Sequence, residues 1–268
     1  MTPHDVTVSD DLLADYAHLT DAVERRRIEG NEFFVCEGPQ ALDRLIASDH
    51  HIRSVLLIDT KADRVLGDLT TPLPPDTPII RVTREEMRDI VGFDLHRGVI
   101  ASADRRPAPT PDDERSLIDR ARRIAVLNGL NDPENLGAIA RSAHALGIDV
   151  LICDPTCIDH YTRRTVRVSM GEILHLPVIR STSYAHLAEL LAGWETWALT
   201  PDPTAHDIWT LPVPDRLALL LGAEGPGLDR VVIDAATRAV RIPITTGVDS
   251  LNVGNAAAVA FAIVNRPQ

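Results

Sequence analysis

The chain has 268 residues, 44% of them hydrophobic, and a formal net charge of −12 at pH 7. This length and hydrophobic content suffice for one large core or two modest ones, and the length favours two domains. No apolar run approaches the length of a membrane span, and acidic residues stand near the N-terminus where a signal peptide has basic ones. These observations predict a soluble, cytoplasmic protein without membrane contact.

The positive charges are almost all arginine, because Lys61 is the single lysine. A net charge of −12 ordinarily counts against a nucleic-acid partner, since phosphate binding draws on clustered cations. Two arginine clusters, at 25–27 and 163–167, favour such a partner, because arginine suits bidentate phosphate contacts and stacking on bases. The alternative for each cluster is a solvated surface balanced by acidic residues.

The three cysteines, Cys36, Cys153 and Cys157, are odd in number, which argues against a disulfide framework. Cys153 and Cys157 are four residues apart, but no second Cys or His pair stands at zinc spacing. We therefore expect buried thiols and no metal site.

The first 103 residues alternate short strand patterns with helical ones. Strands are expected at 33–38, 52–59 and 77–83, and helices at 38–48 and 83–91. This alternation predicts a small α/β domain. Residues 104–116 follow with three prolines and no apolar periodicity, which is the composition of a stiff linker.

The remaining residues, 117–268, carry six strand patterns separated by helical stretches. The strands are expected at 123–130, 149–154, 176–181, 194–200, 217–222 and 241–244. Strands that alternate with helices are typical of βαβ units, so this second domain is predicted to be an α/β domain with a parallel sheet.

The helical pattern at 131–149 has an apolar stripe for burial and a second, distinctive face. Glu134, Gly137, Arg141 and His144 run down that second face. Gly137 lies one turn before Arg141 and removes a side chain where a ligand could approach. This face is a candidate site.

Two later segments also place small or polar residues after a strand, where open parallel sheets bind ligands. At 219–228 an apolar strand enters a loop with three glycines around Glu224. At 241–264 a strand ends at Pro243, and Ser250 and Asn252 precede an Ala-rich helix. Ser250 also suits the N-cap of that helix, which alone would explain a serine there.

Together and in this order, the three segments resemble the signature motifs of the SpoU family, also called TrmH, of RNA ribose 2′-O-methyltransferases in the SPOUT superfamily. In the first motif an Asn is followed by a Gly two residues on and by an Arg four residues after that Gly. The second motif is Gly-x-Glu-Gly followed shortly by Gly-Leu. The third is Ile-Pro and then Ser-Leu-Asn-Val. They are matched by Asn135, Gly137, Arg141, residues 222–225, residues 227–228, Ile242, Pro243 and residues 250–253.

Further segments carry the resemblance beyond these motifs. Residues 167–171 are similar to the family's Arg-x-Ser-x-Gly segment. Residues 1–103 are similar, through the segments 33–46 and 92–103, to the ribosomal-protein-like substrate-binding domain that many members carry before the catalytic domain. Gly254 and Asn255 depart from the Ser-Val that usually follows the third motif. That departure falls on the last helix and concerns its packing more than catalysis.

The resemblance implies a trefoil-knotted catalytic domain that forms a homodimer and binds S-adenosylmethionine largely through main-chain contacts, with no metal. A Rossmann-type methyltransferase is the competing fold, but no strand leads into a Gly-x-Gly-x-x-Gly turn. The implied catalytic residues are Arg141, Asn135, Glu224, Ser250 and Asn252. The implied cofactor-binding residues are Leu221, Gly222, Gly225, Ile242, Pro243, Leu251 and Asn252.

Arg141 has two possible roles in a reaction that needs a ribose hydroxyl to lose its proton. The family proposal lets this arginine and the substrate phosphate draw off the proton. A guanidinium stays protonated in proteins, so we favour a clamp on the phosphate that also stabilises the developing alkoxide. His144, one turn further on, is the alternative base by its ordinary pKa.

The resemblance implies S-adenosylmethionine-dependent ribose 2′-O-methylation of RNA, with ribosomal RNA favoured by the N-terminal domain. The alternatives are a tRNA 2′-O-methyltransferase and an RNA-binding protein with the same fold and no catalysis. Retention of the five catalytic residues argues against the last.

Overall fold

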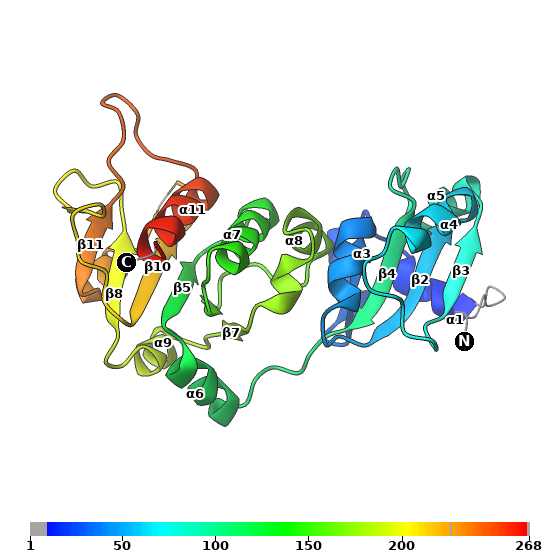
Figure 1. Cartoon of the computed structure of the whole chain (residues 1–268), viewed down its shortest axis with the longest axis horizontal. Coiled ribbons are helices and arrows are strands. Elements are labelled where there is room, and N and C mark those ends of the chain that lie inside the picture. Colours follow the sequence, from blue (N-terminus) through cyan, green and yellow to red (C-terminus); the bar gives the residue numbers. More distant parts are fainter. Residues whose placement is uncertain (1–9, 226, 267–268) are drawn as a thin grey trace. The chain divides into compact units, whose positions relative to one another are not determined.

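The computed structural model describes residues 10–225 and 227–266 and divides the chain into two compact units. Unit 1 comprises Met1–Pro107 together with Tyr161–His175, and unit 2 comprises Ala108–His160 together with Leu176–Gln268. Figure 1 follows both units along the chain. Within the described ranges, no helix has the length and apolar character that crossing a bilayer requires.

Unit 1 is built on a four-stranded sheet of order β1-β4-β2-β3. Its strands are β1 (Phe33–Glu37), β2 (Ile52–Ile58), β3 (Ile79–Val82) and β4 (Val99–Asp104). β4 pairs antiparallel with β1 and β2, while β2 and β3 are parallel. The sequence predicted β1, β2 and β3 but not β4, which lies inside the sheet.

Helices pack around this sheet, and the two that the sequence predicted, at 38–48 and 83–91, are among them. They are α1 (Asp10–Leu13), η1 (Ala14–Tyr16), α2 (Ala22–Glu29), α3 (Pro39–Ile46), α4 (Asp59–Gly67), α5 (Arg84–Val91), α8 (Arg163–Val168) and η2 (Glu172–His175). α5 begins with a capping box, in which Thr83 and Glu86 each bond the other's backbone N–H. Met87 and Val91 on this helix are buried against the sheet.

The segment Tyr161–His175 contributes to unit 1 although it was predicted to belong to the second domain. Arg163 Nη1 lies 2.6 Å from Glu37 Oε2 at the end of β1, and His50 Nε2 lies 3.0 Å from Tyr161 Oη. Arg44 Nε donates to Glu172 Oε1 at 2.7 Å. The second arginine cluster therefore pairs in part with an acid of this unit.

The first arginine cluster also forms ion pairs within the chain. Arg25 is buried and its Nε lies 2.7 Å from Glu29 Oε1, while Arg27 pairs with Glu24 one turn away. The Arg27–Glu24 pair corresponds to the solvated, acid-balanced alternative for this cluster, whereas Arg25 is paired inside the unit.

Part of the segment predicted as a linker is helical. α6 (Pro111–Arg120) begins at Thr110, whose hydroxyl accepts the Asp113 N–H while the Asp113 carboxylate accepts the Thr110 N–H. Pro111 stands at the first turn, where a missing N–H costs nothing. The proline that indicated a linker is therefore also a helix start.

Unit 2 contains a seven-stranded sheet of order β7-β6-β5-β10-β8-β11-β9, and among the described residues every neighbouring pair of its strands is parallel. The strands are β5 (Arg123–Asn128), β6 (Val150–Cys153), β7 (Val178–Arg180), β8 (Glu195–Leu199), β9 (His206–Asp207), β10 (Leu217–Gly222) and β11 (Arg238–Arg241). The predicted parallel α/β fold is confirmed.

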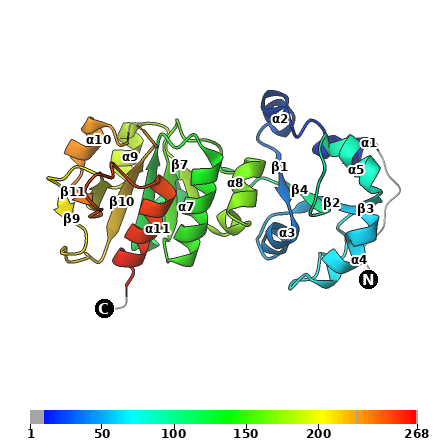
Figure 2. The same cartoon turned by 90° about the horizontal axis from the view of Figure 1, so that it is seen from above.

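Helices cover both faces of this sheet, as alternating buried side chains require. One face of the sheet shares a core with α6, α9 (Tyr184–Leu190) and α10 (Arg230–Ala235). Its strands contribute Ile124, Val126, Ala218 and Leu220 to that core. α7 (Pro133–Ala145) and α11 (Val253–Val264) lie side by side on the sheet (Figure 2).

Two details of the predicted strands are wrong. The strand expected at 241–244 ends at Arg241, so Ile242 and Pro243 belong to the following loop. Proline has no N–H for a ladder bond, which favours this earlier end. β9 was not expected at all. Cys36, Cys153 and Cys157 are free and buried, as predicted.

Candidate active site

A cavity of about 610 Å³ opens at the carboxyl end of the unit 2 sheet. It is bounded by the loops that follow β8, β10 and β11 and by the start of α11. Its lining residues are Leu199, Thr200, Pro201, Leu221, Gly222, Ala223, Glu224, Gly225, Gly227, Leu228, Ile233, Ile242, Ile244, Ser250, Leu251, Asn252, Val253 and Ala256. The volume lies within the roughly 300–1,000 Å³ of small-molecule sites.

The loop after β10 turns back on itself against Gly222. A Cβ on Gly222 would lie 2.2 Å from the carbonyl carbon of Gly227 and 2.3 Å from the nitrogen of Leu228. Gly225 and Gly227 have φ values of +85° and +71°, in the region that favours glycine. Gly222 is therefore required by the loop's own backbone, which is a stronger reason than the ligand access inferred from sequence.

α11 begins after Asn252, which is its N-cap instead of Ser250. The Asn252 Oδ1 accepts the Asn255 N–H at 3.2 Å. Ser250 lies two residues before this cap and lines the cavity. The capping explanation considered for Ser250 is thus wrong, and the serine is exposed next to the ligand space.

The amide of Asn252 connects the three sequence motifs. Its Nδ2 donates to Asn135 Oδ1 at 2.9 Å and also to Glu224 Oε1. Asn135 is buried, and its own Nδ2 lies 3.4 Å from Asp132 Oδ2. Three residues that are far apart in the sequence thus form one hydrogen-bonded group beside the cavity.

A buried carboxylate orders the loop that leads into α7. Asp154 Oδ2 accepts the Asn128 Nδ2 at 2.6 Å and the Gly129 N–H at 3.2 Å. Its Oδ1 accepts the N–H groups of Thr156 and Cys157, both at 2.9 Å. Sequence reasoning missed Asp154, although an Asp directly after an apolar strand was a signal for it.

Arg141 lies on the exposed face of α7 and does not line the cavity. Within the described part of the chain it makes no hydrogen bond or ion pair, so its guanidinium is available to a ligand. His144 is exposed one turn later. Gly137 is buried in α7, so it does not share the exposed face that sequence periodicity assigned to it.

The structure gathers most of the residues expected to bind the cofactor. Six of them line the cavity, namely Leu221, Gly222, Gly225, Ile242, Leu251 and Asn252. Pro243 does not line it. Sequence reasoning missed Leu199, Thr200 and Pro201. Their signal was a small polar residue and a proline directly after the β8 strand pattern.

The cavity has a mostly apolar lining with a single carboxylate. Glu224 is the one charged residue among its described lining, and the rest are mostly apolar or glycine. The described residues include no group of three or more His, Cys, Asp or Glu side chains that could hold a metal ion.

Comparison with known proteins identifies the family. Residues 122–262 match the model of the SpoU rRNA Methylase family. An uncharacterised tRNA/rRNA methyltransferase of Mycobacterium tuberculosis is 36% identical over 96% of this chain and 90% of its own length. The chain belongs to the SpoU family. It is therefore an RNA methyltransferase, as the three motifs predicted.

Solved structures have folds similar to that of this SpoU protein. The AdoMet-bound rRNA methyltransferase of Sinorhizobium meliloti has a TM-score of 0.75 and 23% identity, covering 98% of this chain and 97% of its own. A second structure, which concerns the 2-OH methylation of C/U34 on tRNA, has a TM-score of 0.51 and 26% identity. The match covers 55% of this chain and 95% of that chain.

Proposed function

We propose that this SpoU protein transfers the methyl group of S-adenosylmethionine to a ribose 2′-hydroxyl of RNA, with ribosomal RNA as the substrate. The observation that carries the proposal is the hydrogen-bonded group of Asn135, Glu224 and Asn252 beside the cavity. These residues come from the three family motifs. The cytoplasm is the proposed location.

S-adenosylmethionine fits the lining of the carboxyl-end cavity. Its sulfonium is positive, and Glu224 offers the only charge among the described lining residues. Leu221, Ile242 and Leu251 supply apolar surface, and the glycines around Glu224 allow the main chain to approach a ligand closely. When bound, the cofactor supplies an electrophilic methyl group.

The residues of the chain then position the ribose and stabilise its oxygen. Asn252 donates to Asn135 and Glu224, which holds the three motif segments in one arrangement. Ser250 has an exposed hydroxyl next to the ligand space. The Arg141 guanidinium binds a substrate phosphate and stabilises charge on the attacking oxygen, while the hydroxyl proton passes to an oxygen of that RNA phosphate and S-adenosylhomocysteine leaves.

Arg141 does not line the cavity of its own chain, so its role depends on assembly or on the RNA. We propose a homodimer through the catalytic domain, formed by the exposed faces of α7 and α11. Ser142, Ala258 and Val259 are only partly buried on these helices, so they leave surface that a second copy can cover. Sedimentation showing a stable, active monomer would contradict this assembly.

The trefoil knot also belongs to this proposal. Its support is the strand order, because β10 pairs with both β5 and β8 and so returns the chain to the middle of the sheet. The ligand-binding loops that follow β8, β10 and β11 then lie together at the carboxyl end of the sheet.

Methyl transfer from tritiated S-adenosylmethionine to purified ribosomal RNA and tRNA tests the function. Both RNAs should come from cells that lack this protein, so that the target ribose is unmodified. Incorporation into ribosomal RNA, followed by ribose-methylation mapping, is the expected result. Incorporation into tRNA alone would favour the tRNA substrate described for the 26%-identical structure. No incorporation into either would favour an RNA-binding protein without catalysis.

A further inference from the structure

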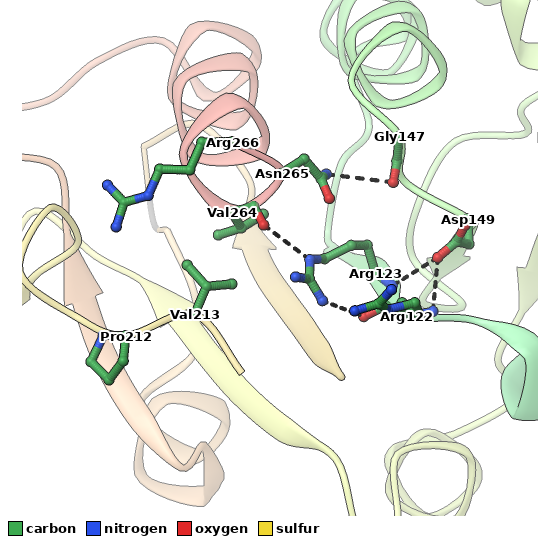
Figure 3. Close-up of a pocket in the computed structure, with 9 residues that line it drawn as sticks. All are labelled: Arg122, Arg123, Gly147, Asp149, Pro212, Val213, Val264, Asn265 and Arg266. Atoms are coloured by element: carbon green, nitrogen blue, oxygen red, sulfur yellow. Dashed lines mark hydrogen bonds between the residues drawn. The ribbon is translucent and has the colours of Figure 1, made fainter. Parts of the chain in front are cut away.

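Unit 2 contains a second cavity at the opposite end of its sheet. It has a volume of about 590 Å³ and lies where β5 begins and α11 ends. Figure 3 shows Arg122, Arg123 and Asp149 on one side and Arg266, Val213 and Pro212 on the other. β5 spans six residues from Arg123 to Asn128, so this cavity lies roughly 17 Å from the carboxyl end of that strand.

Positive charge is concentrated around this cavity. Arg122, Arg123 and Arg266 line it against a single acid, Asp149, although the whole chain carries a net charge of −12. Asp149 is already engaged, because its Oδ2 accepts the backbone N–H groups of Arg122 and Arg123, both at 2.8 Å. The wall therefore has an excess of cations.

Arg123 is a buried cation that the chain satisfies only in part. Its residue exposure is 8%, and its Nε donates to the Val264 carbonyl at 3.1 Å. Its Nη1 donates to the carbonyls of Asp215 and Arg122 at 2.8 and 2.9 Å. These bonds tie the end of α11 to the start of β5, which is a structural role.

That structural role leaves part of the Arg123 guanidinium unused. Among the described residues no carboxylate forms an ion pair with it, and none accepts a hydrogen bond from its Nη2. Burial lowers the pKa of Arg123, and the charge of Arg122 lowers it further. An anion in the cavity would relieve both effects.

The two other arginines stand at the opening. Arg266 is exposed and forms no ion pair with the described residues, and Arg122 lies 3.6 Å from the highly exposed Asp215 carboxylate. Exposed pairs of this kind are weak and exchange readily with other anions. Both guanidiniums are therefore available to a ligand held at Arg123.

We propose that this cavity binds the phosphate groups of a small phosphorylated ligand of nucleotide size. Guanidiniums are suited to phosphate because they donate two parallel hydrogen bonds to its oxygens. Pro212, Val213 and Val264 provide an apolar wall for the organic part. The site is separate from the carboxyl-end cavity, with which it shares no lining residue, and it is independent of the proposed methyl transfer.

Titration calorimetry on the full-length protein tests the site with three probes: inorganic pyrophosphate, ADP and adenosine. ADP and pyrophosphate should bind, and adenosine should bind at least tenfold more weakly, since it lacks the charged groups. Saturating S-adenosylhomocysteine should leave ADP binding unchanged. Displacement by S-adenosylhomocysteine would place ADP in the carboxyl-end cavity and overturn the proposal.

Variants at the opening keep the test independent of folding. Arg122→Gln and Arg266→Gln change exposed side chains, and together they should weaken ADP binding by about tenfold or more. Arg120→Gln, an exposed arginine of α6 outside the lining, is the matched control and should bind as the parent does. Arg123→Met should abolish binding, with folding checked by circular dichroism.

Two results would overturn the proposal. One is the absence of pyrophosphate and ADP binding at millimolar concentration in the parent protein. The other is equal loss of affinity in the double variant and in Arg120→Gln, which would indicate general charge attraction. A 5′-phosphorylated trinucleotide that binds where its 5′-hydroxyl form does not would identify an RNA end as the source of the phosphate.

Discussion

The two ends of the unit 2 sheet differ in how they use polar side chains. At the carboxyl end, Asn135, Glu224 and Asn252 bond to one another, and no arginine is among the described lining residues of the cavity. At the amino end, Arg122, Arg123 and Arg266 surround the cavity, and Arg123 bonds main-chain carbonyls. One sheet thus offers a weakly charged site and a strongly cationic one.

This difference indicates what each end is built to hold. Mutual bonds between side chains fix loops in one arrangement, which suits a cofactor that must be oriented for in-line transfer. A buried cation bound only to carbonyls, as Arg123 is, keeps its charge uncompensated, which suits an anion. The predictions below at Arg141, Gly222 and Asn252 test the carboxyl-end site in different ways.

The largest expected effect is at Arg141, which stands outside the carboxyl-end cavity. Arg141→Ala should lower the methylation rate by about a hundredfold or more, the range for loss of one charge-stabilising group. The affinity for S-adenosylhomocysteine should stay unchanged, because Arg141 does not line the cavity. Single-turnover kinetics and calorimetry measure the two quantities separately.

Two further variants distinguish the clamp from the alternative base. Arg141→Lys should restore little activity, because an ammonium cannot make the planar, two-pronged contact with a phosphate. His144→Ala should remain active. If His144→Ala abolished methylation and Arg141→Ala did not, the base would be the histidine and the clamp model would be wrong.

Gly222→Val should disrupt the carboxyl-end loop and, with it, cofactor binding. A side chain there would overlap the backbone of Gly227 and Leu228, so the loop must move. We expect at least a tenfold loss of S-adenosylhomocysteine affinity in calorimetry, with the global fold kept as judged by circular dichroism. Gly67→Ala, where a Cβ meets open space, is the control. Unchanged affinity in a folded Gly222→Val protein would count against the cavity as the cofactor site.

Much of the fold was predictable because it depends on local patterns. Alternating strand and helix patterns identified β5, β6, β7, β8 and β10 and hence the parallel sheet. β4 was missed, and Ile242 and Pro243 were placed in a strand because the apolar run continues past Arg241. The loss of pairing at that point depends on Pro243 and on neighbouring strands, which a sequence window does not contain.

The sites were predictable to different degrees. The motifs named Asn135, Glu224 and Asn252, but the bond between Asn252 and Asn135 joins residues 117 positions apart and follows only from the fold. The amino-end cavity had no sequence signal, because Arg122 and Arg266 come from opposite ends of unit 2. A pair of adjacent arginines before an apolar strand is typical of an ordinary solvated strand start.

Asn252 has two functions that can be separated by substitution. Asn252→Ser keeps an oxygen to accept the Asn255 N–H and cap α11, but it cannot reach Asn135 and Glu224 together. Asn252→Ala loses both the cap and the bridge. We expect both variants to lose activity by about tenfold, the effect of one charge-assisted or positioning hydrogen bond.

Thermal unfolding shows which function each variant has lost. Asn252→Ala should be less stable than Asn252→Ser by about 1 kcal/mol, the value of an N-cap. If Asn252→Ser kept full activity, the bridge between the motifs would be unimportant, and the asparagine would serve only as a cap.

The smallest expected effect concerns the thiols near the carboxyl end of β6. A hydrogen bond with Cys153 and burial both raise the pKa of Cys157, and its Sγ donates to the Leu127 carbonyl at 3.1 Å. Burial likewise raises the pKa of Cys36 in unit 1. Because the thiolate is the reactive form, both cysteines should react slowly with iodoacetamide at neutral pH, and rapidly only in denaturant. Raising the pH to 9 in native buffer should accelerate labelling much less than it does for a free thiol, since the native pKa values lie above that pH. Methylation activity should be the same before and after such treatment, because the thiols are not among the residues lining the cavity.

Rapid modification of Cys157 in the native protein, with loss of activity, would give the opposite result. It would show that the loop held by Asp154 opens and that the carboxyl end of the sheet is less rigid than its hydrogen bonds indicate.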